Sequence, residues 1–196
     1  MKKLLLSTTL LAGLFSIQAH ADYVAPAPSV ASQAAQYSIM DIHNLTKAAK
    51  AGQAGAQFYL GTKYQFGKDV QQDDRQAFAW FKAAADQGLS SAQLNVGRML
   101  ADGLGTKKDE VLARQYFEKA ASRGDNRASF NLAMMEEQKK NYMGAYQWSE
   151  LSTRDGMLDN KVITLSEGKK TALAANLTQD QIRQARDRAD KWIQAQ

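Results

Sequence analysis

The residues with the clearest chemical potential lie in a short segment near the C-terminal end. Residues 166–169 read Ser-Glu-Gly-Lys and fit the pattern Ser-x-x-Lys, in which a lysine assists a serine nucleophile in acyl transfer. The motifs that accompany this pattern are missing, because Ser-Asp-Asn does not occur and Lys170-Thr171 is followed by Ala172, not by glycine. Matches of four residues also arise by chance. We therefore predict no catalytic residue.

Histidine and cysteine chemistry is limited by number. The sequence has two histidines, His20 and His43, and no cysteine. A catalytic triad would depend on His43 alone once an N-terminal leader carrying His20 is removed, and zinc-binding clusters of histidine or cysteine cannot form. The segment 103–105 (Gly-Leu-Gly) lacks the third glycine of a phosphate-binding loop. The sequence thus predicts neither a metal site nor a bound cofactor.

Charge argues against a further class of partner. The formal net charge is +5, and removal of residues 1–21 takes away Lys2 and Lys3, so that it becomes +3 (23 − 20). Basic residues in the segment 107–127 are interspersed with acidic ones, which is typical of a solvated helix surface and not of a phosphate-binding stripe. We predict no nucleic-acid partner.

The elements around these residues follow a repeat of 36 residues. Small residues recur at this interval in two registers, namely Ala56, Ala92 and Ala128, and Gly52, Gly88 and Gly124. Gly61 and Gly97 keep the same spacing, with Ala133 as the third member. Small residues at fixed positions let two helices cross closely, and a period of this length built from helix pairs is typical of a solenoid.

The first unit carries a family resemblance. Residues 56–64 (Ala-Gln-Phe-Tyr-Leu-Gly-Thr-Lys-Tyr), followed by Gly67, Val70, Asp73, Ala77, Trp80, Ala84, Ala85 and Gly88, resemble a Sel1-like repeat. This family is related to the tetratricopeptide repeat and has a longer loop inside each unit. The resemblance covers residues 41–196 and implies an all-α, right-handed α-α solenoid of about three helix pairs. Asp69 and Thr106 depart from the family's loop pattern, where glycine and valine are usual.

The repeat register divides this region into segments. We predict an N-terminal half-repeat helix (33–53), repeat 1 (54–88), repeat 2 (89–124), a shortened repeat 3 (125–156) and C-terminal capping helices (157–196). First helices are expected near 54–66, 90–102 and 126–138, and second helices near 74–87, 110–123 and 142–155, each ended by a glycine. The third unit is four residues shorter in the loop between its helices, since Gly124 and Gly156 are 32 residues apart (156 − 124).

The C-terminal segment has the features of a capping helix. Thr178 and Gln181 have the spacing of a capping box. One helical face is apolar and consists of Ile182, Ala185, Ala189, Trp192 and Ile193. We expect ion pairs four residues apart on the outside, namely Arg183 with Asp187, Arg186 with Asp190, and Asp187 with Lys191.

The N-terminal residues have the three parts of a secretory signal peptide. Lys2 and Lys3 precede an apolar run over 4–15, and Ala-His-Ala at 19–21 forms the cleavage site. We predict a signal peptide (1–21) cleaved after Ala21, a linker (22–32) that contains both prolines, and a periplasmic or secreted mature protein. The apolar run is too short to span a bilayer, so no transmembrane segment is expected after cleavage. Without cysteine there is no lipoprotein anchor.

Stacked helix pairs present a curved surface lined by their first helices. By the tetratricopeptide pattern, the predicted partner groove takes three residues from each unit: Thr62, Gln65 and Phe66; Arg98, Ala101 and Asp102; and Met134, Glu137 and Gln138. Phe58, Leu94 and Phe130 recur at one offset, which favours core packing. Phe66, Met134 and Met135 do not recur, and are the better candidates for contact with a partner.

These observations favour a non-enzymatic adaptor. The resemblance implies an exported scaffold that binds a protein or peptide partner in the cell envelope. Two alternatives remain open: a binder of peptidoglycan or another carbohydrate without catalysis, and a hydrolase acting on cell-wall or β-lactam substrates. The sequence leaves the partner and the oligomeric state undetermined.

Overall fold

The computed structural model describes residues 36–154 and 160–196, and over these residues it contains helices and no strand. The predicted signal peptide, the predicted linker and residues 155–159 lie outside the described residues. The helices are α2 (Ile42–Lys50), α3 (Ala54–Phe66), α4 (Asp74–Asp86), α5 (Ser90–Asp102), α6 (Glu110–Ala121), α7 (Asn126–Gln138), α8 (Tyr142–Leu151), α9 (Asn160–Ala174) and α10 (Gln179–Gln194). The predicted all-α class and the predicted first helices are confirmed.

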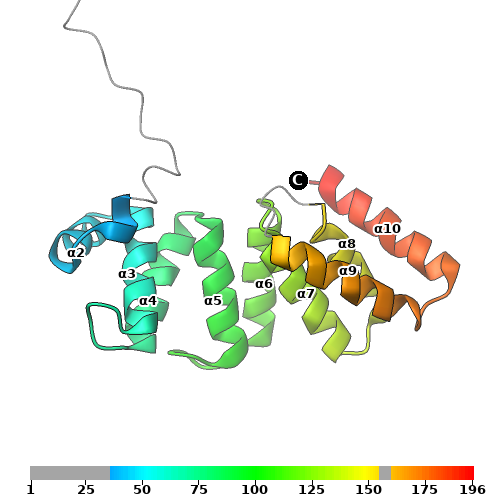
Figure 1. Cartoon of the computed structure of the whole chain (residues 1–196), viewed down its shortest axis with the longest axis horizontal. Helices are drawn as coiled ribbons and strands as arrows, with labels where there is room; N and C mark the ends of the chain where they lie inside the picture. The colour runs from blue at the N-terminus through cyan, green and yellow to red at the C-terminus, as the bar shows by residue number, and fades with distance from the viewer. Residues whose placement is uncertain (1–35, 155–159) are drawn as a thin grey trace, which may run out of the picture.

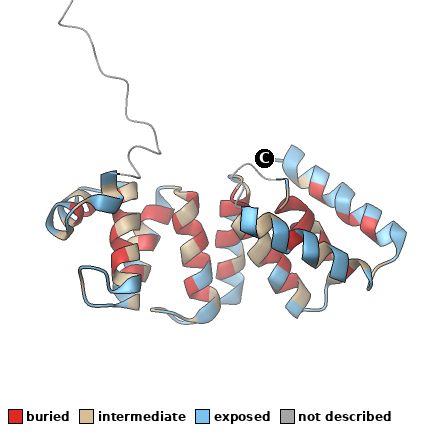
Figure 2. Ribbon diagram, in the orientation of Figure 1, coloured by how far each residue is buried: buried red, intermediate tan, exposed pale blue. Residues whose placement is uncertain are grey.

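The helices form pairs that follow one another along the long axis of the molecule (Figure 1). The pairs α3–α4, α5–α6 and α7–α8 make the most extensive contacts, and α4 with α5 and α6 with α7 join neighbouring pairs. The pattern of burial agrees with this pairing, because buried residues face between the helices and exposed residues cover the outer turns (Figure 2). The main core is continuous from Ala77 in α4 to Trp148 in α8 and Ala189 in α10. The apolar residues of each unit are thus buried against the neighbouring units, as a solenoid requires.

The close helix crossings depend on glycine. A Cβ at Gly61 would lie 2.8 Å from Cδ1 of Phe81, and a Cβ at Gly97 would lie 2.6 Å from Cε1 of Phe117. Both phenylalanine side chains are fully buried, and each lies in the second helix of the same unit as its glycine. The repeated glycine therefore makes room for the repeated aromatic ring.

The connections within the units differ as expected. Residues 67–73 join α3 to α4 and residues 103–109 join α5 to α6, whereas only residues 139–141 join α7 to α8. Gly67 and Gly103 end the first helices in the left-handed conformation. Asp73 and Asp109 cap the starts of the second helices: the Asp73 carboxylate accepts hydrogen bonds from two backbone N–H groups of the first turn, and the Asp109 carboxylate accepts one.

The N-terminal half-repeat differs from its prediction. A continuous helix was expected from about residue 33, but α2 begins at Ile42 after a separate helical turn at 36–39. Asp41 accounts for the break, because its backbone is extended and its side chain accepts a hydrogen bond from the N–H of Asn44. Leu45 and Ala49 of α2 are fully buried against Leu60 of α3, as the repeat register predicts.

The C-terminal helices pack on α8. Thr178 and Gln181 form the predicted capping box at the start of α10. Of the predicted apolar face, Ile182, Ala185 and Ala189 are buried, but Ile193 is 45% exposed. None of the helices in the described ranges is both long enough and apolar enough to span a bilayer.

The predicted ion pairs along α10 are wrong. Arg183 pairs with Asp180 within α10, while Arg186 bonds to Tyr146 and Asp190 pairs with Arg154. Tyr146 belongs to α8, and Arg154 follows that helix directly. For Arg186 and Asp190, partners on or next to α8 replace partners within α10 because the two helices pack against each other.

Candidate partner-binding surface

The nine residues of the predicted groove occupy equivalent places on α3, α5 and α7, near the C-terminal end of each helix. We call them the first-helix surface. Three of them offer side chains well suited to contact: Phe66 is 70% exposed, Met134 is 41% exposed, and Arg98 is exposed on α5. Thr62 is half-buried, and its hydroxyl donates to the carbonyl of Phe58 within α3.

Arg98 is the unusual charge of the first-helix surface. No salt bridge joins it to a carboxylate among the described residues. Burial of the guanidinium lowers the pKa of Arg98, the nearby Arg127 lowers it further, and Asp125 and Asp102 oppose the shift. Because an arginine stays protonated in proteins, Arg98 is a partly desolvated cation whose charge is not neutralised by a direct partner.

The third unit contributes less open surface than predicted. The carboxylate of Glu137 pairs with the ammonium group of Lys169 on α9, and that group lies 5.9 Å from the ring centre of Phe130. Helix α9 thus covers part of α7. Met134 and Gln138 remain exposed, and Ala101 and Gln65 are half-buried. The exposed members of this set are therefore Phe66, Arg98, Asp102, Met134 and Gln138.

The structure separates contact candidates from core residues. Leu94 is buried, and Phe58 packs against the ring of Phe81 with their centres 5.6 Å apart, in agreement with the recurrence of that position. Met135, which was expected as a contact candidate, is only 8% exposed and belongs to the main core. A methionine next to an exposed one on a helix faces another direction, so non-recurrence alone did not distinguish Met134 from Met135.

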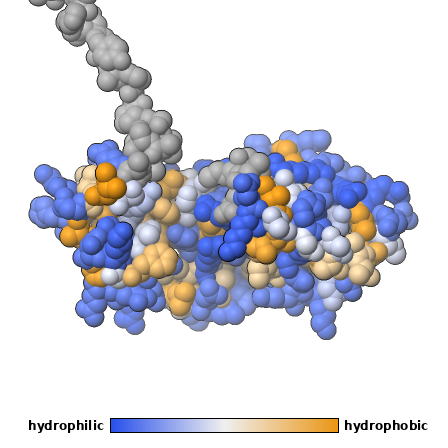
Figure 3. Space-filling model, viewed as in Figure 1, coloured by the Kyte–Doolittle hydropathy of each residue, from blue (hydrophilic) through white to orange (hydrophobic). Residues whose placement is uncertain are grey.

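The view in Figure 3 shows separate hydrophobic areas among hydrophilic residues. No single large apolar patch dominates that face. Partners that bind mosaic surfaces of this kind use a few anchoring side chains surrounded by polar contacts.

The Ser-x-x-Lys segment is placed in a structural role. Ser166 is fully buried, and its hydroxyl lies 2.6 Å from the hydroxyl of Ser152. Lys169 extends toward Glu137 on α7. A serine nucleophile needs a base within hydrogen-bond reach and access for the substrate; in the described residues Ser166 is enclosed and bonded to Ser152, while Lys169 bonds to another helix.

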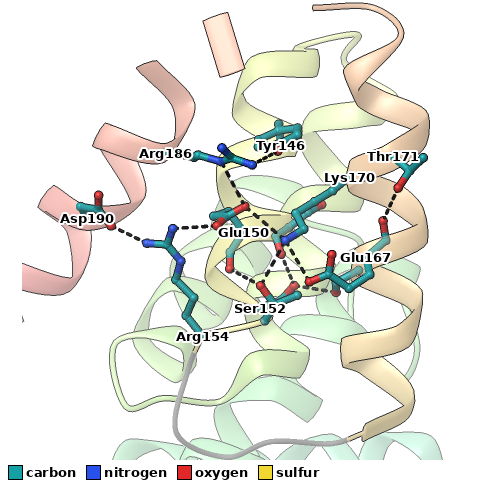
Figure 4. Close-up of polar contacts among 12 residues, drawn as sticks. Tyr146, Glu150, Ser152, Arg154, Glu167, Lys170, Thr171, Arg186 and Asp190 are labelled. Atoms are coloured by element: carbon teal, nitrogen blue, oxygen red, sulfur yellow. Dashed lines mark hydrogen bonds and ion pairs between the residues drawn. The ribbon is translucent and has the colours of Figure 1, made fainter. Parts of the chain in front are cut away.

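Near Ser152 lies a group of one tyrosine and five charged residues that we call the C-terminal clamp: Tyr146, Glu150, Arg154, Lys170, Arg186 and Asp190 (Figure 4). Glu150 is 6% exposed, and its carboxylate lies 2.7 Å from Arg154 and 3.2 Å from Lys170. Burial alone would raise the pKa of Glu150, but the charges and hydrogen bonds of Lys170 and Arg154 outweigh burial and lower it. The clamp links α8 to α9 and α10.

The other candidate residues have simpler surroundings. His43 is exposed on α2 and borders a shallow hollow with Ile42 and Thr46. Within residues 36–154 and 160–196, no three histidine, aspartate or glutamate side chains converge in a way that could hold a metal ion.

The arrangement of paired helices with glycine crossings and left-handed loop glycines defines a helical-repeat protein. The Sel1 repeat family model matches residues 54–89 and 90–125, so that its units begin at α3 and α5. The chain is 32% identical to a Sel1 repeat protein from Oxalobacter formigenes of known structure, with a TM-score of 0.54, over 65% of this chain and 98% of that one. This chain belongs to the Sel1 repeat family.

A second solved structure supports the fold alone. It is c5321, a protective antigen present in uropathogenic Escherichia coli strains and displaying an SLR fold, which is 23% identical with a TM-score of 0.55. The match covers 78% of this chain and 40% of that one. No curated protein matches the sequence.

Two groups of residues were not recognised as groups from the sequence. The C-terminal clamp brings together residues that are as far apart in sequence as 146 and 190, and no local sequence pattern predicts such a contact. The exposed apolar side chains Leu104, Val111 and Leu112 were also missed. A comparison between units could have found them, because unit one has Lys68, Arg75 and Gln76 at the positions 36 residues earlier.

Proposed function

We propose that this chain is an exported, non-enzymatic adaptor that binds a protein or peptide partner through the first-helix surface. The observation that carries the proposal is that Arg98 has no salt bridge within residues 36–154 and 160–196 and lies on the helix between those that present Phe66 and Met134. An exposed aromatic ring, a methionine and an arginine are the side chains most often found as anchors in interfaces.

The same arrangement suggests the chemistry of the partner. A partly desolvated guanidinium gains most from a carboxylate, which it can bind through two parallel hydrogen bonds. Phe66 and Met134 would receive apolar side chains of the partner, and methionine adapts to irregular shapes. The partner segment is therefore acidic at its centre and apolar on both sides.

The test is photo-cross-linking in living cells. A photoreactive amino acid is placed at Phe66 or Met134, and the captured species are identified by mass spectrometry. A control with the same amino acid at Ile193 tests specificity, because Ile193 on α10 is 45% exposed and Met134 is 41% exposed. The proposal predicts one envelope protein captured from both surface positions and not from Ile193.

A second experiment separates the alternatives. A variant that carries the photoreactive amino acid at Met134 together with Phe66→Ala and Arg98→Ala should lose the captured partner while keeping its circular dichroism spectrum. Equal capture by this variant would refute the assignment of the surface. Binding of the unaltered chain to purified sacculi without any protein adduct would favour the peptidoglycan alternative, and turnover of a β-lactam would favour the hydrolase alternative.

A further inference from the structure

The loop of unit two covers the beginning of α4 in unit one. Gly105 lies in this loop with φ 66°, and a Cβ at this position would overlap the backbone carbonyl of Asp74. The loop between α5 and α6 extends toward the lower end of α4 in Figure 1. Glycine is needed here twice, since its left-handed backbone turns the loop and its lack of a side chain permits the contact.

Unit three cannot cover α6 in the same way. Only residues 139–141 join α7 to α8, so the third unit has no counterpart of the segment that contains Gly105. The position on α6 equivalent to Asp74 is Glu110 (74 + 36). Asp74 is half-buried, whereas Glu110 is exposed. The shortened connection therefore leaves the start of α6 open.

The side chains at this open place are apolar. Val111 is 72% exposed, Leu104 is 43% exposed and Leu112 is 37% exposed. Leu112 also borders a shallow hollow with Leu100, the loop residues 106–109 and Glu110. We call Leu104, Val111 and Leu112, with the neighbouring Lys107 and Lys139, the α6 edge. Exposed apolar residues that replace polar ones at repeat-equivalent positions are typical of a contact surface.

The charges of the α6 edge are positive. Neither Lys107 nor Lys139 forms an ion pair with a carboxylate among the described residues. Lys108 pairs with Glu110 at 2.8 Å and lowers the pKa of that carboxyl, and Lys139 lies near enough to lower it further. Glu110 is already paired, and Asp109 is bound to the backbone of α6. Lys107 and Lys139 are therefore suited to bind acidic groups of a partner.

We propose that the α6 edge binds an acidic loop of a partner protein, with a glycine at its turn and an apolar residue beside it. This loop takes the place that Gly105 and its neighbours occupy on α4. The glycine is required because a side chain at the closest point meets the backbone of the helix start, as at Asp74. The site is separate from the first-helix surface, so either proposal can fail without the other.

The test uses three synthetic peptides and the isotope-labelled mature chain. One peptide places Gly-Leu-Gly between pairs of aspartate and glutamate, the second has lysines in place of the acids, and the third has alanines in place of the glycines. Nuclear magnetic resonance should show shifts at 104–112 and 139–141 for the acidic glycine peptide, with at least tenfold weaker binding of the other two.

Variants locate the site. Val111→Asp and Lys139→Glu should each weaken binding of the acidic peptide at least tenfold, and both variants should fold normally because both side chains are exposed. Arg75→Glu, at the equivalent place in unit one, is the matched control and should leave binding unchanged. Replacing residues 139–141 by the sequence of 103–109 should cover the edge and abolish binding.

Three results would overturn the proposal. The first is equal affinity for the acidic and lysine peptides, and the second is no binding at millimolar peptide. The third is self-association of the chain, seen by sedimentation and abolished by Val111→Asp, which would assign the edge to a second copy.

Discussion

The first two units and the C-terminal end of this protein are held together by different means. In units one and two, Gly61 faces Phe81 and Gly97 faces Phe117, and these contacts exclude any other side chain at the glycine positions. In the third unit Ala133 stands at the glycine position and Ser149 at the phenylalanine position. Both partners of the crossing, the phenylalanine and the glycine, are therefore different residues in the third unit.

The C-terminal end uses long-range polar contacts instead. The ring centres of Trp148 and Trp192 are 4.9 Å apart, which joins α8 to α10, and the C-terminal clamp surrounds this region with charges. In the repeated units, the same glycine and phenylalanine fit together because both residues recur with the sequence. The end of the array instead needs contacts to helices that have no repeat equivalent. Shape and charge respond differently to mutation, temperature and pH.

The largest expected effect comes from filling a glycine crossing. Gly97→Leu places its Cβ 2.6 Å from the Phe117 ring, so the helices must separate or the ring must leave the core. Overpacking costs about 1–3 kcal/mol or more, and displacement of a buried phenylalanine adds roughly 3–5 kcal/mol. The variant should be largely unfolded by circular dichroism at 37 °C.

A matched control makes this prediction specific. Gly168 lies in α9, and a Cβ there would meet no atom within 4 Å. Gly168→Leu should therefore melt at the same temperature as the unaltered protein or above it, since leucine favours a helix by about 0.5–1 kcal/mol over glycine. In addition, Gly97→Ala should be less damaging in a Phe117→Leu background, and strict additivity of the two changes would contradict the crossing model.

The next effect tests the C-terminal clamp. Glu150→Gln removes a buried carboxylate and leaves Lys170, whose side chain is 14% exposed, without that counter-charge. Because the lysine is partly solvated, we expect a loss of roughly 2–3 kcal/mol, below the value for a fully buried pair. Hydrogen exchange should speed up in α10 more than in α5.

The exposed pair of Lys82 and Asp86 is the control for the clamp. These side chains are 50% and 55% exposed, so Asp86→Asn should change stability by less than about 0.5 kcal/mol. If Asp86→Asn and Glu150→Gln had equal effects, burial of Glu150 would not be the cause.

The same contrast explains what the sequence predicted. The first helices were placed correctly because Gly61 and Gly97 recur with their aromatic partners, and Asp73 and Asp109 were recognised as helix starts from their local spacing. The break at Asp41 was missed because no repeat equivalent marks it. The clamp could not be predicted, since the meeting of Glu150 with Lys170 depends on how α9 folds back. Of the first-helix surface, the sequence predicted the exposure of Phe66 but not the pairing of Glu137 with α9.

Acid should affect the C-terminal end through Glu150. The pKa of Glu150 is lowered in the folded protein, so its contribution to stability is present above the unfolded value of about 4.3 and is lost as the pH falls through the folded value. Between pH 7 and pH 5 little change is expected. Below about pH 4.3 the amides of α10 should lose protection, and this pH dependence should be much weaker in Glu150→Gln. A profile that is identical in the two proteins would show that other carboxyl groups control acid stability.

The smallest expected effect distinguishes two helix starts within the repeated part. The side chain of Asp73 accepts hydrogen bonds from the N–H groups of Arg75 and Gln76, whereas the side chain of Asp109 accepts one from Leu112. Removing such a cap costs about 1 kcal/mol. Asp73→Ala should therefore lower the free energy of unfolding in urea slightly more than Asp109→Ala, while Asp73→Asn, which keeps an accepting oxygen, should restore most of the loss. If Asp73→Asn were as damaging as Asp73→Ala, the negative charge near the helix start, and not the hydrogen bond, would be the source of the stabilisation.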